Sequence, residues 1–157
     1  MTDCKTKAEA RKVKAEAGKA ALRRRLAEML TVPNEGCLDI LLSYKTRLLA
    51  TRVAPAPYDE AASQMIRQLI ADLATAVASL KHLAVLFDEG KAITETADEA
   101  TAALYNAAKA WKAGSRISDA DLDVLERTVD LLGDVLKETR ISEYKAVLKL
   151  VEKELTP

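Results

Sequence analysis

Aromatic residues and histidine are scarce in this chain of 157 residues. Aromatic side chains make up 4% of the sequence, with one Trp and one Phe, and His82 is the only histidine. A carboxylate-bridged metal bundle needs two Glu-x-x-His pairs on facing helices, so a single histidine excludes that class. A zinc site needs three or four suitably spaced Cys, His or carboxylate ligands, and no such spacing occurs. The core must therefore be built from Leu, Val, Ile and Ala. Each Ala buries little area, so an Ala-rich core depends on many contacts.

Cysteine and long apolar runs are equally rare. Cys4 and Cys37 are the only two cysteines. Free thiols in a cytosolic chain are the simplest interpretation, and one disulfide between them stays open. The N-terminus lacks the apolar region of a secretion signal, and no run approaches the roughly 18 apolar residues of a spanning helix. We therefore expect a cytoplasmic protein that makes no membrane contact.

No arrangement of reactive side chains predicts catalysis. Cys4 lies close to the terminus, where reaction geometry is poorly held. Helix N-terminal amides after Asn34 could lower the pKa of Cys37, but a small residue packed at a helix start explains that position equally well. His82 lies beside apolar seam residues, as a boundary histidine would. The five glycines are spread along the chain and form no phosphate-binding loop. The sequence predicts neither an enzyme nor a cofactor.

What the chain does contain is helical periodicity between Gly and Pro breaks. The predicted helices cover residues 6–30, a leucine-rich stretch before the 54–57 Ala-Pro connector, and residues 58–87, 96–113, 118–138 and 142–155. Five leucines define the second of them: Leu38, Leu41, Leu42, Leu48 and Leu49. We expect an all-α fold, an antiparallel bundle of about five to six helices forming one domain over residues 1–157. Residues 58–157 would form its core, and the long basic N-terminal helix, residues 1–30, could project as an arm.

Three helices have the clearest local signals. The seam of the third helix alternates spacings of four and three, as in coiled coils, through Ala62, Ile66, Leu69, Leu73, Ala76, Leu80, Leu83 and Phe87. Thr96, with an acidic residue three positions later, predicts the capping box that opens the fourth helix. Ser118 and Asp121 predict a similar start for the fifth, with Ile117 and Leu122 as a hydrophobic staple.

The net charge is zero, but the charges are unevenly distributed. Residues 1–53 contain twelve Lys/Arg and six Asp/Glu, whereas residues 58–157 contain twelve and eighteen. Six carboxylates recur every three or four residues on the fifth helix, about 5–6 Å apart along its axis. We call them the acidic stripe: Asp119, Asp123, Glu126, Asp130, Asp134 and Glu138. Such a row predicts either a solvated helix face or a site for a basic protein partner, with nucleic-acid mimicry as one form.

The basic half of the chain is concentrated near its start. Residues 5–25 contain nine cationic side chains and two Glu. The nine are Lys5, Lys7, Arg11, Lys12, Lys14, Lys19, Arg23, Arg24 and Arg25. On a helix they could bind phosphates, although the segment lacks the aromatics that stack on single-stranded bases.

These features favour a non-enzymatic helical binding or regulatory protein, which would act by protein–protein contacts. It would dock a charged face, such as the acidic stripe, or a leucine-rich helical face onto its partner. A nucleic-acid-binding protein that uses the basic N-terminal helix is the first alternative. The second is a self-assembling structural protein, in which the basic helix of one subunit lies on the acidic stripe of the next. The identity of the partner and the oligomeric state stay open.

Overall fold

The computed structural model describes residue 11 and residues 35–155. Within those ranges the chain forms helices and no strand, so the predicted all-α class is confirmed. The elements are α2 (Glu35–Val53), α3 (Glu60–Leu83), the short 3-10 helix η1 (Ala84–Leu86), α4 (Gly90–Lys112), α5 (Asp119–Glu138) and α6 (Ile141–Leu155). The predicted helix over residues 6–30 falls outside the described residues, apart from Arg11.

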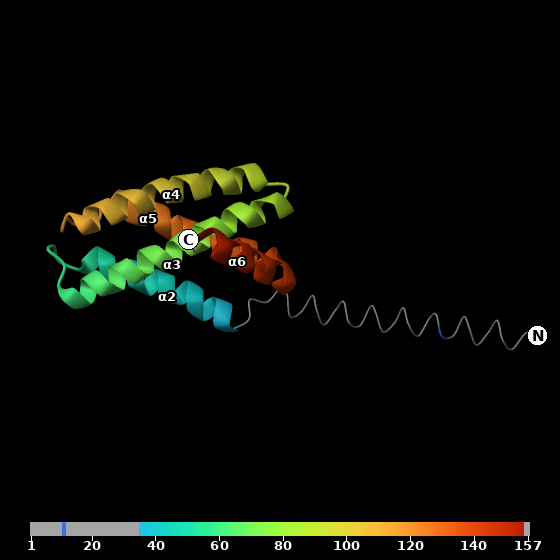
Figure 1. The fold of residues 1–157 in the computed structure, drawn as a ribbon, viewed down its shortest axis with the longest axis horizontal. Helices are drawn as coiled ribbons and strands as arrows, with labels where there is room; N and C mark the ends of the chain where they lie inside the picture. Colours follow the sequence, from blue (N-terminus) through green and yellow to red (C-terminus); the bar gives the residue numbers. More distant parts are fainter. Residues whose placement is uncertain (1–10, 12–34, 156–157) are drawn as a thin grey trace, which may run out of the picture.

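Helix α3 is the centre of the structure and packs against α2, α4, α5 and α6 (Figure 1). The predicted seam is confirmed, because six of its eight residues are buried and only Ala62 and Phe87, at its two ends, are half-buried. Ile66, Leu73 and Leu80 are fully enclosed. Aliphatic side chains of all five helices form the core, as the shortage of aromatic residues requires.

Helices α3 and α4 run in opposite directions along each other. Trp111 Nε1, near the end of α4, donates a hydrogen bond of 2.8 Å to Ser63 Oγ, near the start of α3. Toward the other ends, Lys81 Nζ lies 3.2 Å from Asp98 Oδ1. The single Trp therefore places its ring against the core and satisfies its polar N–H within the protein.

The predicted start of α4 at Thr96 is wrong, since α4 begins six residues earlier, at Gly90. Thr96 Oγ1 instead donates back to the carbonyl oxygen of Ala92, inside the helix. The chain reverses tightly after η1, where the Gly90 N–H donates to the carbonyl oxygen of Phe87. Gly90 lies against the backbone of Ala84, and only glycine fits there without a clash. This close approach between backbones, which no capping pattern encodes, decides where the helix starts.

The predicted start of α5 is confirmed. Ser118 Oγ accepts a hydrogen bond of 3.2 Å from the Asp121 backbone N–H and donates one of 2.8 Å to the Asp121 carboxylate. Ile117 and Leu122, the two staple residues, are both buried. Gly114, just after α4, has a φ of 69°, a left-handed conformation that favours glycine at a helix end.

Replacement of Ser118 by alanine should lower the free energy of unfolding by about 1 kcal/mol, because loss of the cap leaves the Asp121 amide of the first turn without its acceptor. Chemical denaturation would measure the loss. Ser115→Ala, in the same turn, is the matched control, because its side chain is exposed and its hydroxyl forms no hydrogen bond with the residues that the structure describes. Equal stability of the two variants would contradict the capping role.

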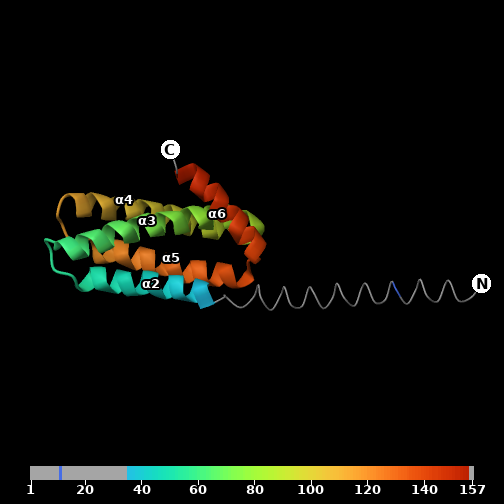
Figure 2. The same ribbon diagram turned by 60° about the horizontal axis from the view of Figure 1, so that its bottom comes forward.

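The second and sixth helices leave some of their apolar residues exposed. On α2, Leu48 is buried, whereas Leu42 and Leu49 are 64% and 61% exposed. On α6, Val147 and Val151 are buried but Leu155 is 52% exposed. The turned view shows α2 to α5 lying alongside one another, with α6 inclined across one end (Figure 2). A helix at the edge of such an arrangement buries one side only, so part of its apolar surface remains uncovered.

One stretch is long and apolar enough to cross a membrane by length and composition alone, Glu60–Leu86. In the structure, 44% of its apolar window is buried against the rest of the protein. The core helix of a soluble protein has the same properties, so this stretch does not distinguish the two environments, and the cytoplasmic location stays a prediction.

Candidate functional site

The acidic stripe lies along one side of α5, away from the buried residues of that helix. All six carboxylates belong to exposed residues, with side-chain exposures from 52% for Glu126 to 76% for Asp134 among those that form ion pairs. Leu122, Val129 and Leu132 face the core instead. The spacing of four and three therefore separates charge from core as predicted, and the stripe is accessible to a partner.

The C-terminal turn of α2 supplies the main counter-charge to the stripe. Arg52 reaches three carboxylates, with Nη1 3.3 Å from Asp119 Oδ1, and Nη2 2.8 Å from Asp123 Oδ1 and 3.4 Å from Glu126 Oε2. The hydrogen bond with Asp123 is the main cause that raises the pKa of the Arg52 guanidinium. Arg116 supports this cluster, because its Nη2 donates to the Arg52 carbonyl oxygen and to Asp119.

Farther along, the same two helices stay paired in antiparallel register. Lys45 forms an ion pair with Asp130, and the hydrogen bond between them raises the pKa of the Lys45 ammonium. At the next level Leu41 lies beside Gly133, where a Cβ would come 3.5 Å from Leu41 Cδ1. Residues near the start of α2 therefore lie level with the C-terminal half of α5.

The last two carboxylates of the stripe lie beyond the reach of these α2 cations. Asp134 pairs weakly with Lys137 on its own helix, at 3.8 Å, and its side chain is 76% exposed. Glu138 is exposed and forms no ion pair within the part of the chain that the structure describes. Negative charge on the stripe is thus best available to a partner at Asp134 and Glu138.

An exposed apolar row on α2 accompanies the stripe. Leu42, Leu49 and Val53 are 64%, 61% and 73% exposed. Their spacing of seven and four places them on one side of the helix, one turn from Lys45 and Arg52, the two residues that reach α5. We call this combined surface, the three apolar residues of α2 and the acidic stripe of α5, the α2–α5 face.

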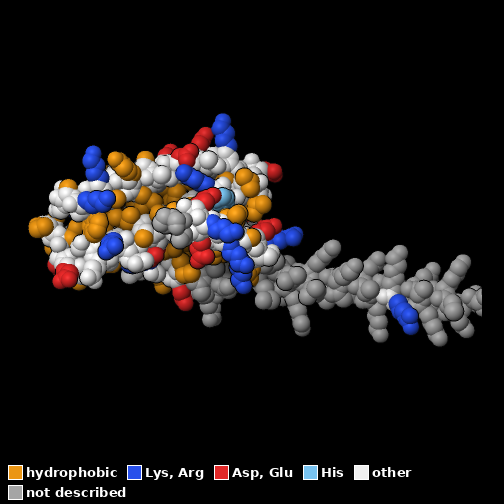
Figure 3. All heavy atoms as spheres, in the orientation of Figure 1, with side chains coloured by type: hydrophobic (Ala, Val, Ile, Leu, Met, Phe, Trp, Pro, Cys, Tyr) orange, Lys and Arg blue, Asp and Glu red, His pale blue; other side chains and the backbone are white. Residues whose placement is uncertain are grey.

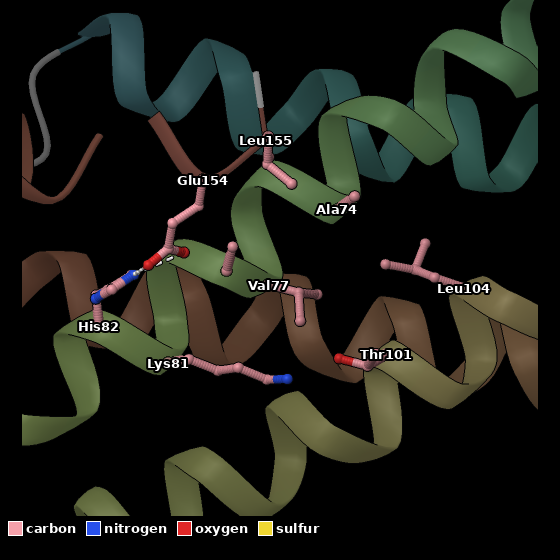
Figure 4. A pocket seen from close by; sticks show the side chains of 9 residues that line it. Ala74, Val77, Lys81, His82, Thr101, Leu104, Glu154 and Leu155 are labelled. Carbon is pink, nitrogen blue, oxygen red and sulfur yellow. Dashed lines mark hydrogen bonds and ion pairs between the residues drawn. The ribbon is translucent and has the colours of Figure 1, made fainter. Parts of the chain in front are cut away.

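A second surface feature is a hollow between α3, α4 and the end of α6. Apolar side chains gather over the α3–α4 side of the molecule (Figure 3). The hollow has a volume of about 560 Å³, and its apolar lining is Ala74, Val77, Ala78, Leu104 and Leu155. At its edge His82 Nε2 lies 3.0 Å from Glu154 Oε1, which joins α3 to the last turn of α6 (Figure 4). Lys81 and His82, its two basic groups, each already face a carboxylate, so the hollow offers no unpaired charge to a ligand.

The other predicted site residues fall largely outside the described part of the chain. Of the nine cations proposed to bind nucleic acid, only Arg11 is described, as an exposed helical residue. Cys4 and the side chain of Cys37 also lie outside, so their pairing stays open. Among the described residues, no group of three or more His, Cys, Asp or Glu side chains could hold a metal ion.

Sequence reasoning missed both contributions of α2 to this surface. It identified the acidic stripe but not Arg52 and Lys45 as its counter-charges, and it named Leu42 and Leu49 among the leucines of the second helix without indicating that they would be exposed. The signal for the ion pairs was present, because Lys45 and Arg52 are seven residues apart and so share a helix face. Nothing in the sequence indicated which helix that face would meet.

In comparisons with known proteins, no family model, curated protein or solved structure matches the chain.

Proposed function

We propose that this chain is a non-enzymatic helical binding or regulatory protein that acts through protein–protein contacts on its α2–α5 face. The main support is the exposed apolar row of Leu42, Leu49 and Val53 beside half-exposed carboxylates. Single exposed apolar residues are ordinary, but three in one row next to a charged row resemble the core and rim of an interface. The partner that fits is a basic amphipathic helix, with apolar anchors for α2 and cations for α5.

Inhibition by nucleic-acid mimicry is a narrower form of this proposal, and the ion pairs weigh against it. Arg52, Lys45, Arg116 and Lys137 already contact five of the six carboxylates. Partly neutralised carboxylates give less affinity than a bare row would, and they serve better to orient a partner that the apolar row holds. A basic protein helix therefore suits the surface better than a broad phosphate-binding groove does.

The test is capture of partners from cell lysate by the tagged full-length protein, with and without nuclease, with mass spectrometry and stoichiometry as the readout. We expect a stoichiometric protein partner to resist nuclease, and its recovery to fall roughly tenfold or more in Leu42→Gln/Leu49→Gln, since anchors at an interface centre contribute most of its affinity. Asp134→Lys/Glu138→Lys should lower recovery as well. These two positions are chosen because reversing Asp123 would also disturb Arg52.

The matched control is Glu95→Lys/Glu99→Lys on α4, which reverses two exposed charges at the same spacing on another helix. The control should capture the partner as the unchanged protein does, and all variants should keep the same thermal unfolding midpoint. Equal recovery by the Leu42→Gln/Leu49→Gln variant and the control would show that the α2–α5 face does not bind the partner.

The same experiment distinguishes the alternative functions. Nucleic acid recovered with the protein, and proteins lost on nuclease treatment, would favour binding through the cations of residues 5–25. Recovery of untagged copies of this chain would favour self-assembly. As part of the proposal, residues 1–157 form one cytoplasmic domain, an antiparallel bundle with a long basic N-terminal helix.

A further inference from the structure

The α2–α5 face has a complementary segment within the same chain. We propose that residues 5–30 fold back along α2 and bind the α2–α5 face of their own molecule as a helical hairpin. The inference rests on the proposed function, because it uses the same surface and names its resident occupant.

The first argument is composition. Residues 5–25 contain nine cations and two Glu, the character of partner that the acidic stripe selects. Three of the large apolar residues of the segment, Leu22, Leu26 and Met29, are spaced by four and three, as on one side of a helix. One helix could therefore present apolar anchors to α2 and cations to α5 together.

The second argument is register. The segment is joined to the start of α2 by residues 31–34, a length typical of loops between antiparallel helices. When the helices on both sides of that loop have the same axial rise per residue, each residue of the segment lies opposite one residue of α2. Arg23, Arg24 and Arg25 then lie opposite residues 40–42 of α2. Leu41 lies beside Gly133 of α5, so the three arginines reach the level of Asp134 and Glu138. Those are the two carboxylates that the α2 cations leave unpaired.

The third argument concerns the apolar row. In the same register Leu22 comes level with Ser43, next to the exposed Leu42. Ala15 comes level with Ala50, and two small side chains at one level let the helix backbones approach. Docking in this register would cover apolar surface that the described residues leave in water.

Binding within one molecule is favoured over exchange between copies. A connection of four residues gives the segment an effective concentration in the millimolar range, well above ordinary protein concentrations. The short connection also imposes the antiparallel direction that places the arginines opposite Asp134 and Glu138.

The test measures one distance in the full-length protein. Spin labels at Ala15→Cys and Ala50→Cys, with Cys4→Ser and Cys37→Ser, report the separation of the two segments by pulsed dipolar spectroscopy. Two packed helices would place the labels about 20 Å apart, from axes about 8–10 Å apart plus the label arms. Labels 35 residues apart on a continuous helix would lie roughly 50 Å apart at 1.5 Å per residue. We expect the short distance between the two labels. We also expect this distance to stay the same when the labelled protein is diluted with unlabelled protein.

Two variants test the proposed contacts. Asp134→Lys/Glu138→Lys should lower the ratio of short to long distances roughly tenfold, because two attractive pairs become repulsive ones. Addition of Arg24→Glu/Arg25→Glu should restore it, whereas Glu95→Lys/Glu99→Lys should leave it unchanged. Restoration by the opposite charge change would show direct pairing, which a general loss of stability cannot mimic.

Each other outcome overturns the inference. A long distance in the unchanged protein would show that the segment does not dock on its own molecule. A short distance that disappears on dilution would assign the contact to a second copy. In either case the proposed function survives if the Leu42→Gln/Leu49→Gln variant still loses its external partner, and it fails separately if that variant keeps it.

Discussion

Replacement of Leu80 by alanine is expected to lower the free energy of unfolding by about 3 kcal/mol, within the 2–5 kcal/mol typical of buried leucines. Leu80 is fully buried in α3, the helix that packs against the other four described helices. The loss combines the transfer free energy of the removed carbons with the cavity that they leave.

Chemical denaturation and thermal unfolding would measure this effect. At this chain length, about 3 kcal/mol corresponds to a fall of roughly 6–12 °C in the unfolding midpoint. Leu150→Ala is the control, because it removes the same atoms from a side chain that is 50% exposed on α6. The control should lose less than about 1 kcal/mol, in proportion to the smaller area it buries. Similar losses in both variants would show that Leu80 is not at the centre of the folding unit.

Gly90→Ala is expected to lower the free energy of unfolding by about 2 kcal/mol, although alanine is the better helix former. A Cβ at position 90 would lie 2.2 Å from the carbonyl oxygen of Ala84 and 3.1 Å from its carbonyl carbon. Both atoms belong to the backbone, so relief requires the turn between η1 and α4 to move. That carbonyl oxygen also accepts the Phe87 N–H, a bond that such a movement would weaken.

Gly133→Ala is the opposite case and the matched control. Gly133 lies within α5, where a new Cβ would meet Leu41 Cδ1 at 3.5 Å, an ordinary contact. Here alanine should raise the free energy of unfolding by about 0.5–1 kcal/mol, because glycine loses more backbone entropy in a helix. Equilibrium denaturation of the two variants should therefore give changes of opposite sign. A rise in the free energy of unfolding in Gly90→Ala would mean that the turn before α4 has room for a Cβ at position 90.

The two destabilising variants, Leu80→Ala and Gly90→Ala, lie away from the proposed binding surface. Leu80 and Gly90 lie in α3 and at the start of α4, whereas the α2–α5 face is formed by exposed residues of α2 and α5. Binding experiments with the surface variants can therefore be interpreted at constant stability, and stability experiments with the core variants at constant surface chemistry.

Local patterns in the sequence were sufficient for the apolar seam of α3 and for the start of α5, but not for the end of α3, which stops at Leu83 within the helix predicted over residues 58–87. The apolar seam of α3 repeats at helical spacing over most of its length, and burial follows it because one helix side must leave water. The start of α5 was predictable to the residue, because a Ser118 side chain can satisfy an amide only two or three positions ahead. The separation of the acidic stripe from the buried face of α5 is a property of the same kind, since it depends only on the period of one helix.

The tertiary structure decided the features that depend on contacts between different helices and turns. Thr96 has the residue types of a cap, yet α4 begins at Gly90 because the backbone of Ala84 comes close there. Leu42, Leu48 and Leu49 look alike in sequence, and only the position of α2 at the side of α3 and α5 buries Leu48 alone. The pairing of Arg52 with three α5 carboxylates arises between residues more than 60 positions apart. Helical periodicity acts over one or two turns, so the sequence by itself determined the helices and their apolar sides, whereas the packing of those sides determined which residues remained exposed for binding.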